Sequence, residues 1–290
     1  MMRTGWTFVA AISLAFLVVN DALAVLIFDD GQSHVINQPS DAITVLNSAA
    51  PDDLPTTVTI STGGVIDSVA PVISAAASVF GTSGIELAGG SILTNAGGGH
   101  GLVAFDNAQI KMTSGTIAPL GASSAGISIE GNAQAEVLGG TIDATSIGLN
   151  GFGQTYSVVR GGTIRGDAEA FHLGVNSQLH VYGGLLGDMD GGVDLTVAGG
   201  EAHFYGSAFQ LNGVPVAQGL IAGPGNFVGR LTGMLDSGES LDIGIRVEDL
   251  GPGVMFPALI YVHVPEPSSL LLLTCASFGA FAGGRARCRS

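Results

Sequence analysis

The sequence predicts an all-β protein: a single-stranded parallel β-helix of about 22–26 residues per coil, followed by a small antiparallel β C-terminal cap. The first observation behind this prediction is a repeat in which Gly-Gly or Ser-Gly is followed by a short pair that ends in Ile or Leu. Successive second glycines are 26, 25, 25, 22, 22 and 16 residues apart, a period typical of a solenoid. These glycines are Gly64, Gly90, Gly115, Gly140, Gly162 and Gly184, with a degenerate copy at Gly200.

The residues between the glycines also align, which is the second observation. In four successive repeats the positions 13 before, three before and two after the second glycine are apolar. Segments such as 178–181 alternate apolar and polar residues, and a period of two indicates strands. In a parallel β-helix such columns stack into one core between strands about 4.8 Å apart. The columns are Leu102, Ile127, Leu149 and Phe171; Met112, Val137, Val159 and Val181; and Ile117, Ile142, Ile164 and Leu186.

Glycine and asparagine mark the corners of the predicted coils. Corner positions often need a positive φ, which glycine adopts without steric cost. Asn107, Asn132 and Asn176 each lie eight residues before the second glycine of their repeat. Asparagine tolerates left-handed turns and can form a ladder of side-chain hydrogen bonds along a stack. We expect this column to be a corner, either with such a ladder or with ordinary turn asparagines.

The pattern divides the chain into five segments. Residues 1–24 are expected to be a signal peptide, 25–54 an N-terminal cap and 55–205 the β-helix repeats. Residues 206–263 contain runs of alternating apolar and polar residues, separated by turns rich in glycine and proline. This pattern favours several antiparallel strands that form a cap over the last edge of the solenoid. Residues 264–290 form a C-terminal tail, and helices are expected only in the two terminal segments.

The N-terminus has the three parts of a secretory signal peptide. Arg3 precedes an apolar stretch at 6–19, and Ala22 and Ala24 are the small residues that a signal peptidase requires. Cleavage is expected before Val25. Neither this segment nor the C-terminal tail belongs to the predicted fold.

The C-terminal tail combines a short motif, an apolar stretch and a basic end. Proline on both sides of Glu266 keeps the motif extended, as a processing enzyme would require. The apolar stretch, Leu270 to Phe281, is short for a membrane span, although it could enter the bilayer as a helix with its basic end on the cytoplasmic side. The motif is Pro265, Glu266 and Pro267, and the basic residues are Arg285, Arg287 and Arg289.

This tail resembles the PEP-CTERM sorting signal of Gram-negative bacteria. The resemblance implies export, transient anchoring in the inner membrane by the C-terminal helix, and processing by an exosortase. It places the protein in the cell envelope, at the cell surface or outside the cell, commonly beside exopolysaccharide. An ordinary C-terminal membrane anchor is the alternative.

Composition narrows the partners and cofactors. Between the two terminal segments the chain holds five basic and 22 acidic residues, a net charge of −17. So acidic a surface repels nucleic acid and anionic lipid. Both cysteines, Cys275 and Cys288, lie in the tail, so the body forms no internal disulfide.

The strongest acidic cluster is Asp188, Asp190 and Asp194. Oxygen ligands at alternating positions before glycine resemble part of a calcium loop, but the full spacing and the closing glutamate of an EF-hand are missing. The alternatives are therefore a calcium site and a solvated acidic turn, and no other cofactor is expected. His100, within Gly-Gly-His-Gly, faintly resembles a polygalacturonase motif and is expected to be a turn residue.

The outward-facing columns supply a candidate ligand face. The predicted register places Gln134, Tyr156 and Gln178 in one row, Glu136, Val158 and His180 in the next, and Leu138, Arg160 and Tyr182 in the third. Tyrosines, an arginine and amides can stack on and hydrogen-bond to sugars, so Tyr156, Arg160, His180 and Tyr182 are the candidate residues. The alternative is an ordinary solvent-facing ladder. The same register predicts an exposed ion pair between Lys111 and Glu136.

The predicted fold resembles pectate-lyase-like and autotransporter-passenger β-helices. Those families include polysaccharide lyases, glycoside hydrolases, adhesins and inert stalks, so the fold does not select a function. We expect a non-enzymatic structural or adhesion-type protein of the cell surface or extracellular matrix, associated with polysaccharide. The alternative is a polysaccharide lyase or glycoside hydrolase, in which the aspartates of the acidic cluster would converge with Arg160 or Arg165.

Overall fold

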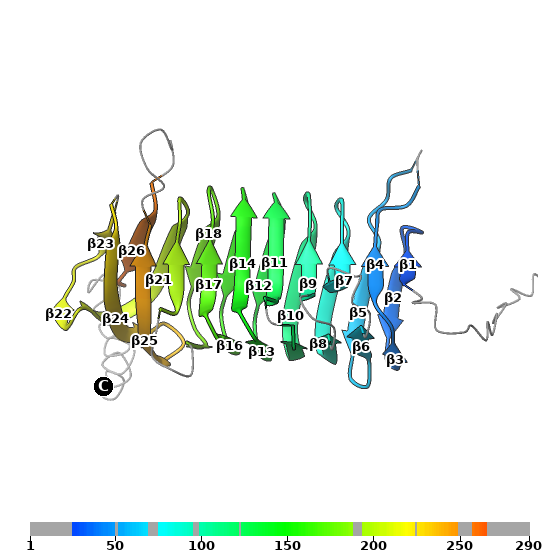
Figure 1. Cartoon of the computed structure of the whole chain (residues 1–290), viewed down its shortest axis with the longest axis horizontal. Helices are drawn as coiled ribbons and strands as arrows, with labels where there is room; N and C mark the ends of the chain where they lie inside the picture. The colour runs from blue at the N-terminus through cyan, green and yellow to red at the C-terminus, as the bar shows by residue number, and fades with distance from the viewer. Residues whose placement is uncertain are drawn as a thin grey trace, which may run out of the picture.

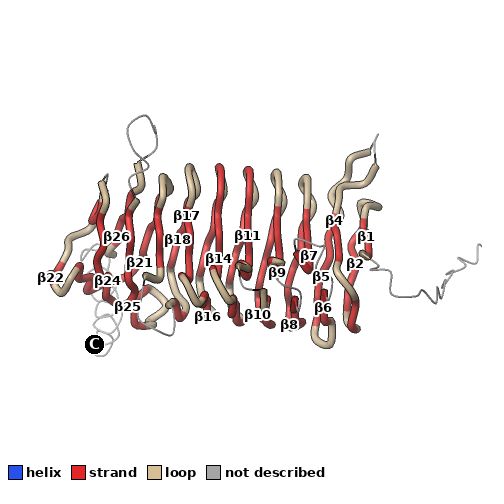
Figure 2. Tube along the Cα trace, in the orientation of Figure 1, coloured by secondary structure: helices blue, strands red, loops and turns tan. Residues whose placement is uncertain are grey.

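The computed structural model describes residues 25–49, 52–68, 75–94, 99–121, 123–187, 193–223, 225–248 and 257–265. This part of the chain is all β, with no helix, and its strands lie side by side along one long axis (Figure 1). Strand segments alternate with loops that lie mainly along the two long edges of the rod in this view (Figure 2). The predicted terminal helices lie outside the described residues.

The strands form three parallel ladders, which we call the first, second and third faces. The first face contains β2 (Ser33–Ile36), β5 (Thr57–Ser61), β8 (Gly84–Thr94), β10 (Gln109–Pro119), β12 (Gln134–Val137), β15 (Tyr156–Val159), β18 (Gln178–Val181), β21 (Glu201–Leu211) and β26 (Leu259–His263). The second contains β3 (Pro39–Ser40), β6 (Val65–Ser68), the ends of β8 and β10, β13 (Thr141–Ala144), β16 (Thr163–Gly166) and β19 (Leu185–Leu186).

The third face completes each coil. It contains β1 (Leu26–Phe28), β4 (Ile43–Val45), β7 (Ala75–Val79), β9 (His100–Ala104), β11 (Ala125–Gly131), β14 (Ile147–Gly153), β17 (Glu169–Leu173), β20 (Leu195–Val197) and β25 (Ser240–Val247). One chain thus passes from face to face and pairs with itself one coil later, which confirms the predicted single-stranded parallel β-helix.

The apolar columns form a continuous core. Leu102, Ile127, Leu149 and Phe171 stack in register on the third face, and all four are fully buried. The columns of the other two faces are equally buried as far as Val181 and Ile164, and the last second-face residue, Leu186, packs on the same core. The alternating pattern has this effect because successive side chains of a strand point to opposite sides of the sheet.

The corner prediction is also confirmed. Gly115, Gly140 and Gly162 have φ values of 104°, 92° and 89°, a region that residues with a Cβ rarely adopt. The Asn132 side-chain amide donates to Asn107 Oδ1 over 3.2 Å, so the asparagine ladder exists for these two residues. Asn176 occupies the same corner with a φ of 63°, which asparagine tolerates.

The parallel ladders begin earlier than the sequence boundary at residue 55. β1 pairs with β4, β2 with β5 and β3 with β6, all in parallel. The described residues of the segment 25–54, which was predicted to be an N-terminal cap, therefore form coil strands of their own. The residues at 33–36 and 43–45 alternate between exposed and buried positions as in the other coils. No Gly-Gly pair accompanies them, so the glycine repeat does not predict these coils.

The C-terminal cap mixes two strand directions. β24 (Phe227–Leu235) runs antiparallel to both β21 and β25. β22 (Val214–Pro215) runs antiparallel to β21, and β23 (Gly219–Ala222) runs antiparallel to β26. β25 and β26 themselves continue the third and first faces in parallel. The cap therefore contains the predicted antiparallel pairs, but its last two strands also extend the parallel ladders of the solenoid.

Candidate functional site

Seven rings gather on four neighbouring strands of the first face. The cause is alternation: each strand points every second side chain outward, and β15, β18, β21 and β26 lie next to one another. We call this group the ring ladder. Its members are Tyr156, His180, Tyr182, His203, Tyr205, Tyr261 and His263.

The rings of the ladder stack face to face along the rod. The ring centroids of His180 and His203 are 4.6 Å apart with planes 7° from parallel, and those of His203 and Tyr261 are 4.8 Å apart at 4°. In the neighbouring row, Tyr205 stacks on Tyr182 at 4.1 Å and on His263 at 4.4 Å. These separations match the distance between paired strands, so the backbone ladder sets the stacking.

Stacking limits what the ladder offers to a ligand. A ring between two others has both faces covered and presents only its edge to solvent. Tyr156 lies at the end of the ladder, is 38 % exposed and tilts by 42° against His180. The Arg160 guanidinium lies 4.5 Å from the centroid of the Tyr182 ring, a cation–π contact. Tyr156 is therefore the ring whose face is best placed for a sugar.

The four residues predicted for the ligand face do come together. Tyr156, His180 and Tyr182 belong to the ladder and Arg160 covers one of its rings. The other four members of the ladder were not among the predicted residues: His203, Tyr205, Tyr261 and His263. Their signal was present as the same alternation of rings at 203–205 and 261–263, but the change of pattern after residue 205 placed the last strand in the cap rather than beside β21.

Hydrogen bonds fix the ring edges. The Nδ1 atom of His180 lies 2.9 Å from the Tyr205 hydroxyl, and Nδ1 of His203 lies 3.0 Å from Nε2 of His263. The second ring nitrogen of His203 lies 3.4 Å from a Glu201 carboxylate oxygen. The histidines are thus linked to one another and to a tyrosine across β18, β21 and β26.

Burial and the neighbouring histidines keep the imidazoles of His180 and His263 neutral. Burial, and then the neighbouring His203 and His263, lower the pKa of His180 to about 4. Burial and His203 also lower the pKa of His263. Burial raises the pKa of Tyr205 to about 12, with hydrogen bonding to Tyr182 as the next cause. At neutral pH, His180, His263 and Tyr205 are therefore uncharged.

The ion pairs of the first face differ in one respect from the prediction. Lys111 and Glu136 are opposite each other in the ladder, as predicted. The Lys111 ammonium, however, contacts Glu86 at 3.5 Å, and Glu136 contacts Arg160 Nε at 3.7 Å. Each carboxylate has a cation on a neighbouring strand, and long side chains can lean either way along the stack. Both pairs are exposed and contribute well under about 1 kcal/mol each.

The predicted calcium ligands are described only in part. Asp188 and Asp190 lie outside the described residues. Asp194 is buried, and its carboxylate accepts the Gly244 backbone N–H over 2.7 Å, which joins the start of β20 to β25. Within the described ranges, no three His, Cys, Asp or Glu side chains are grouped so that they could hold a metal ion.

The residues invoked for catalysis have other contacts. Arg165 lies opposite Asp143 in the second-face ladder, and Arg160 contacts Glu136 and Tyr182. His100 begins β9, where its Nδ1 accepts the Ala125 backbone N–H over 2.9 Å, and burial lowers its pKa. His100 therefore serves as a backbone acceptor between two coils.

The sorting motif is described only at its first residue. Pro265 lies two residues after the end of β26 and lines an apolar pocket of about 500 Å³ with Val264, Phe209 and Val216. Glu266 and Pro267, the basic residues Arg285, Arg287 and Arg289, and the signal-peptidase residues Ala22 and Ala24 lie outside the described residues. In the part of the chain that is described, no helix has the length and apolarity needed to cross a membrane.

Fold and site together define the class of protein: a capped parallel β-solenoid with a ladder of stacked rings on one face. Comparison with protein-family models, with curated proteins and with solved structures finds no match to this chain.

Proposed function

We propose that this chain is an exported, non-enzymatic structural or adhesion-type protein of the cell surface or extracellular matrix. In this proposal a signal peptidase removes residues 1–24, and an exosortase-type enzyme recognises Pro265, Glu266 and Pro267. The body then acts as a rigid acidic rod that makes weak, multivalent contacts with extracellular polysaccharide.

One observation carries this proposal: the ring ladder repeats across four strands of a face that is held rigid by backbone pairing. Ring edges and hydroxyls repeated at coil spacing suit a polymer, which meets the same groups several times. The contacts of Arg160 with Glu136 and Tyr182 favour a binding role for this arginine over the role of a catalytic base.

The test is to incubate the purified chain with a panel of acidic and neutral polysaccharides, with and without calcium, and to record binding and chain cleavage together. We expect binding without cleavage, and no requirement for calcium. Cleavage of any polysaccharide would favour the lyase or hydrolase alternative. Absence of binding to every member of the panel would remove the polysaccharide contact from the proposal.

A further inference from the structure

Two hollows of the surface meet at Tyr156. The first-face hollow, about 490 Å³, extends over β5, β8, β10, β12 and β15, and its lining includes Gln109, Gln134 and Tyr156. The corner hollow, about 420 Å³, lies where the chain enters β15, β18 and β21, and Asn176 and Gln178 line it together with Tyr156. Each has the size of a small-molecule site, and Tyr156 is common to both.

The lining groups form one row along the rod. In register from β10 to β21, this row holds Gln109, Gln134, Tyr156, Gln178 and Glu201. Amide side chains donate and accept hydrogen bonds, as sugar hydroxyls do. The row therefore presents a hydroxyl-complementary group at each coil, about 4.8 Å from the next, with one exposed ring in the middle.

The charges of these hollows disfavour an anionic ligand. The first-face cations, Lys111 and Arg160, each contact a carboxylate. Glu201 is among the residues that line the corner hollow, and the whole chain has a net charge of −15. An anionic polymer would meet net repulsion from this acidic surface, whereas an uncharged sugar meets amides, hydroxyls and a ring.

From this arrangement we infer that the first face binds an uncharged polysaccharide laid along the rod axis, with one sugar stacked on the Tyr156 ring and its neighbours in the two hollows. This inference rests on the proposed function and specifies its ligand class and its central residue. The ring face supplies apolar contact, and the amide row sets the direction of the chain.

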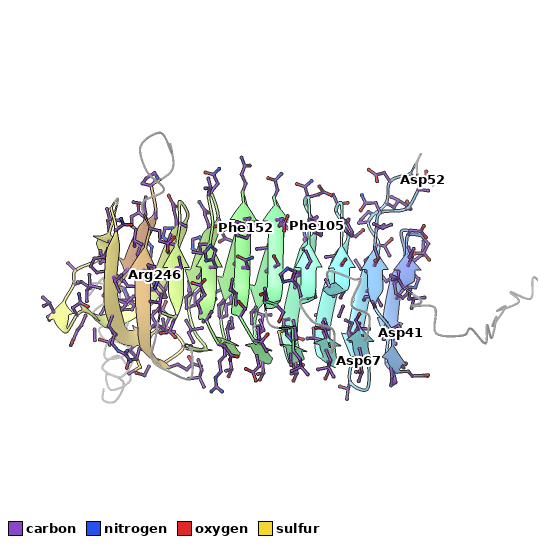
Figure 3. All side chains as sticks on the ribbon, in the orientation of Figure 1. Asp41, Asp52, Asp67, Phe105, Phe152 and Arg246 are labelled. Carbon is purple, nitrogen blue, oxygen red and sulfur yellow. The ribbon has the colours of Figure 1, made fainter. Side chains whose placement is uncertain are left out.

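The test uses the full chain carrying Trp6→Phe, which removes its single tryptophan. Tyr156→Ala is compared with Phe152→Ala, a matched control because Phe152 is a 44 % exposed ring on β14 of the third face (labelled in Figure 3). The ligands are a neutral β-glucan oligosaccharide and an oligogalacturonate of the same length. We expect Tyr156→Ala to weaken glucan binding about tenfold and Phe152→Ala to leave it unchanged, with no binding of the galacturonate.

A second variant separates stacking from a folding defect. In the same background Tyr156→Trp keeps a ring at position 156 and makes it the only tryptophan, so its fluorescence should shift on addition of glucan while affinity is retained. Circular dichroism verifies that each variant is folded.

The inference is overturned if glucan binding survives Tyr156→Ala or falls further in Phe152→Ala. It is also overturned if the tryptophan spectrum does not change or if the chain prefers galacturonate. Each of these outcomes would leave polysaccharide binding itself intact. If the parent chain binds neither oligosaccharide and no polysaccharide of the panel, the polysaccharide contact of the proposed function fails as well.

Discussion

At the scale of single residues, backbone crowding decides which corner positions must be glycine. Gly115 has a φ of 104°, and a Cβ placed there would overlap the carbonyl oxygen of Gly90 in the preceding coil. Gly213, in the turn between β21 and β22, has a φ of 77° but nothing within 4 Å of such a Cβ. The two positions share a left-handed backbone and differ in whether another coil approaches.

This difference predicts unequal effects of the same substitution. We expect Gly115→Ala to lower the free energy of unfolding by roughly 2–4 kcal/mol, because strain and overlap add. Gly213→Ala should cost about 1–2 kcal/mol, from the backbone conformation alone. Urea denaturation of the two variants beside the parent chain measures both values. Equal losses would show that contact between coils is not the reason for glycine at position 115.

The sequence predicts inward residues better than surface contacts. The columns that contain Ile127 and Val137 follow from the repeat, because one register fixes every inward position of a coil. The partner of Lys111 did not follow, since a long side chain can reach a carboxylate on either neighbouring strand and only the packed structure decides which one.

At the scale of strands, the ring ladder depends on pairing between segments far apart in the sequence. β21 and β26 are parallel neighbours, with His203 opposite Tyr261, although β22 to β25 lie between them in the chain. Within the repeats the equal spacing predicts the neighbour of each strand. No Gly-Gly or Ser-Gly pair comes directly before β26, and the strands that precede it in the chain are antiparallel. The repeat therefore does not predict which strand pairs with β26.

The ladder predicts a loss of stability in acid. The folded-state pKa of His180, about 4, lies below the unfolded value of about 6.5. Between these values the unfolded chain binds the proton and the folded chain does not. The stability that neutral His180 contributes is therefore fully present above pH 6.5 and is lost as the pH falls toward 4. We expect a loss of about 1–2 kcal/mol at this half-buried site, after allowance for solvent screening, measured by urea denaturation from pH 7 to pH 4.

His172 supplies the control for that experiment. The His172 ring donates a hydrogen bond to the Glu169 carboxylate, which raises the pKa of His172. The stability that protonated His172 contributes is therefore fully present below pH 6.5 and is lost as the pH rises through the raised value. His180→Gln should flatten the acid side of the stability profile, whereas His172→Gln should leave the loss that His180 causes in place. The same acid slope in His180→Gln and in the parent chain would contradict the assignment.

At the scale of the whole molecule, the two ends of the described rod differ. β1, β2 and β3 each pair with one strand, and Leu26 and Ile27 are 45 % and 56 % exposed. At the other end β23 and β24 add antiparallel partners to β26 and β25. In a solenoid each coil is stabilised mainly by its neighbours, so strands with one neighbour open at lower cost.

Amide hydrogen exchange on the full chain should reveal this difference. We expect amides of β1 to β3 to exchange at least about tenfold faster than those of β12 and β15, because local opening at the edge requires less free energy. Amides of β25 and β26 should be protected like the central strands. Uniform protection from β1 to β18 would mean that the N-terminal edge is covered in solution.

From β11 to β19 the paired residues are 22 apart on all three faces, as in Ile127 with Leu149, Gln134 with Tyr156 and Thr141 with Thr163. A duplication or loss of 22 codons within this stretch would add or remove one complete coil without changing the register on any face. The terminal strands would keep their present neighbours. Rod length is therefore the trait of this protein that a single genetic event can alter with the least damage to its fold.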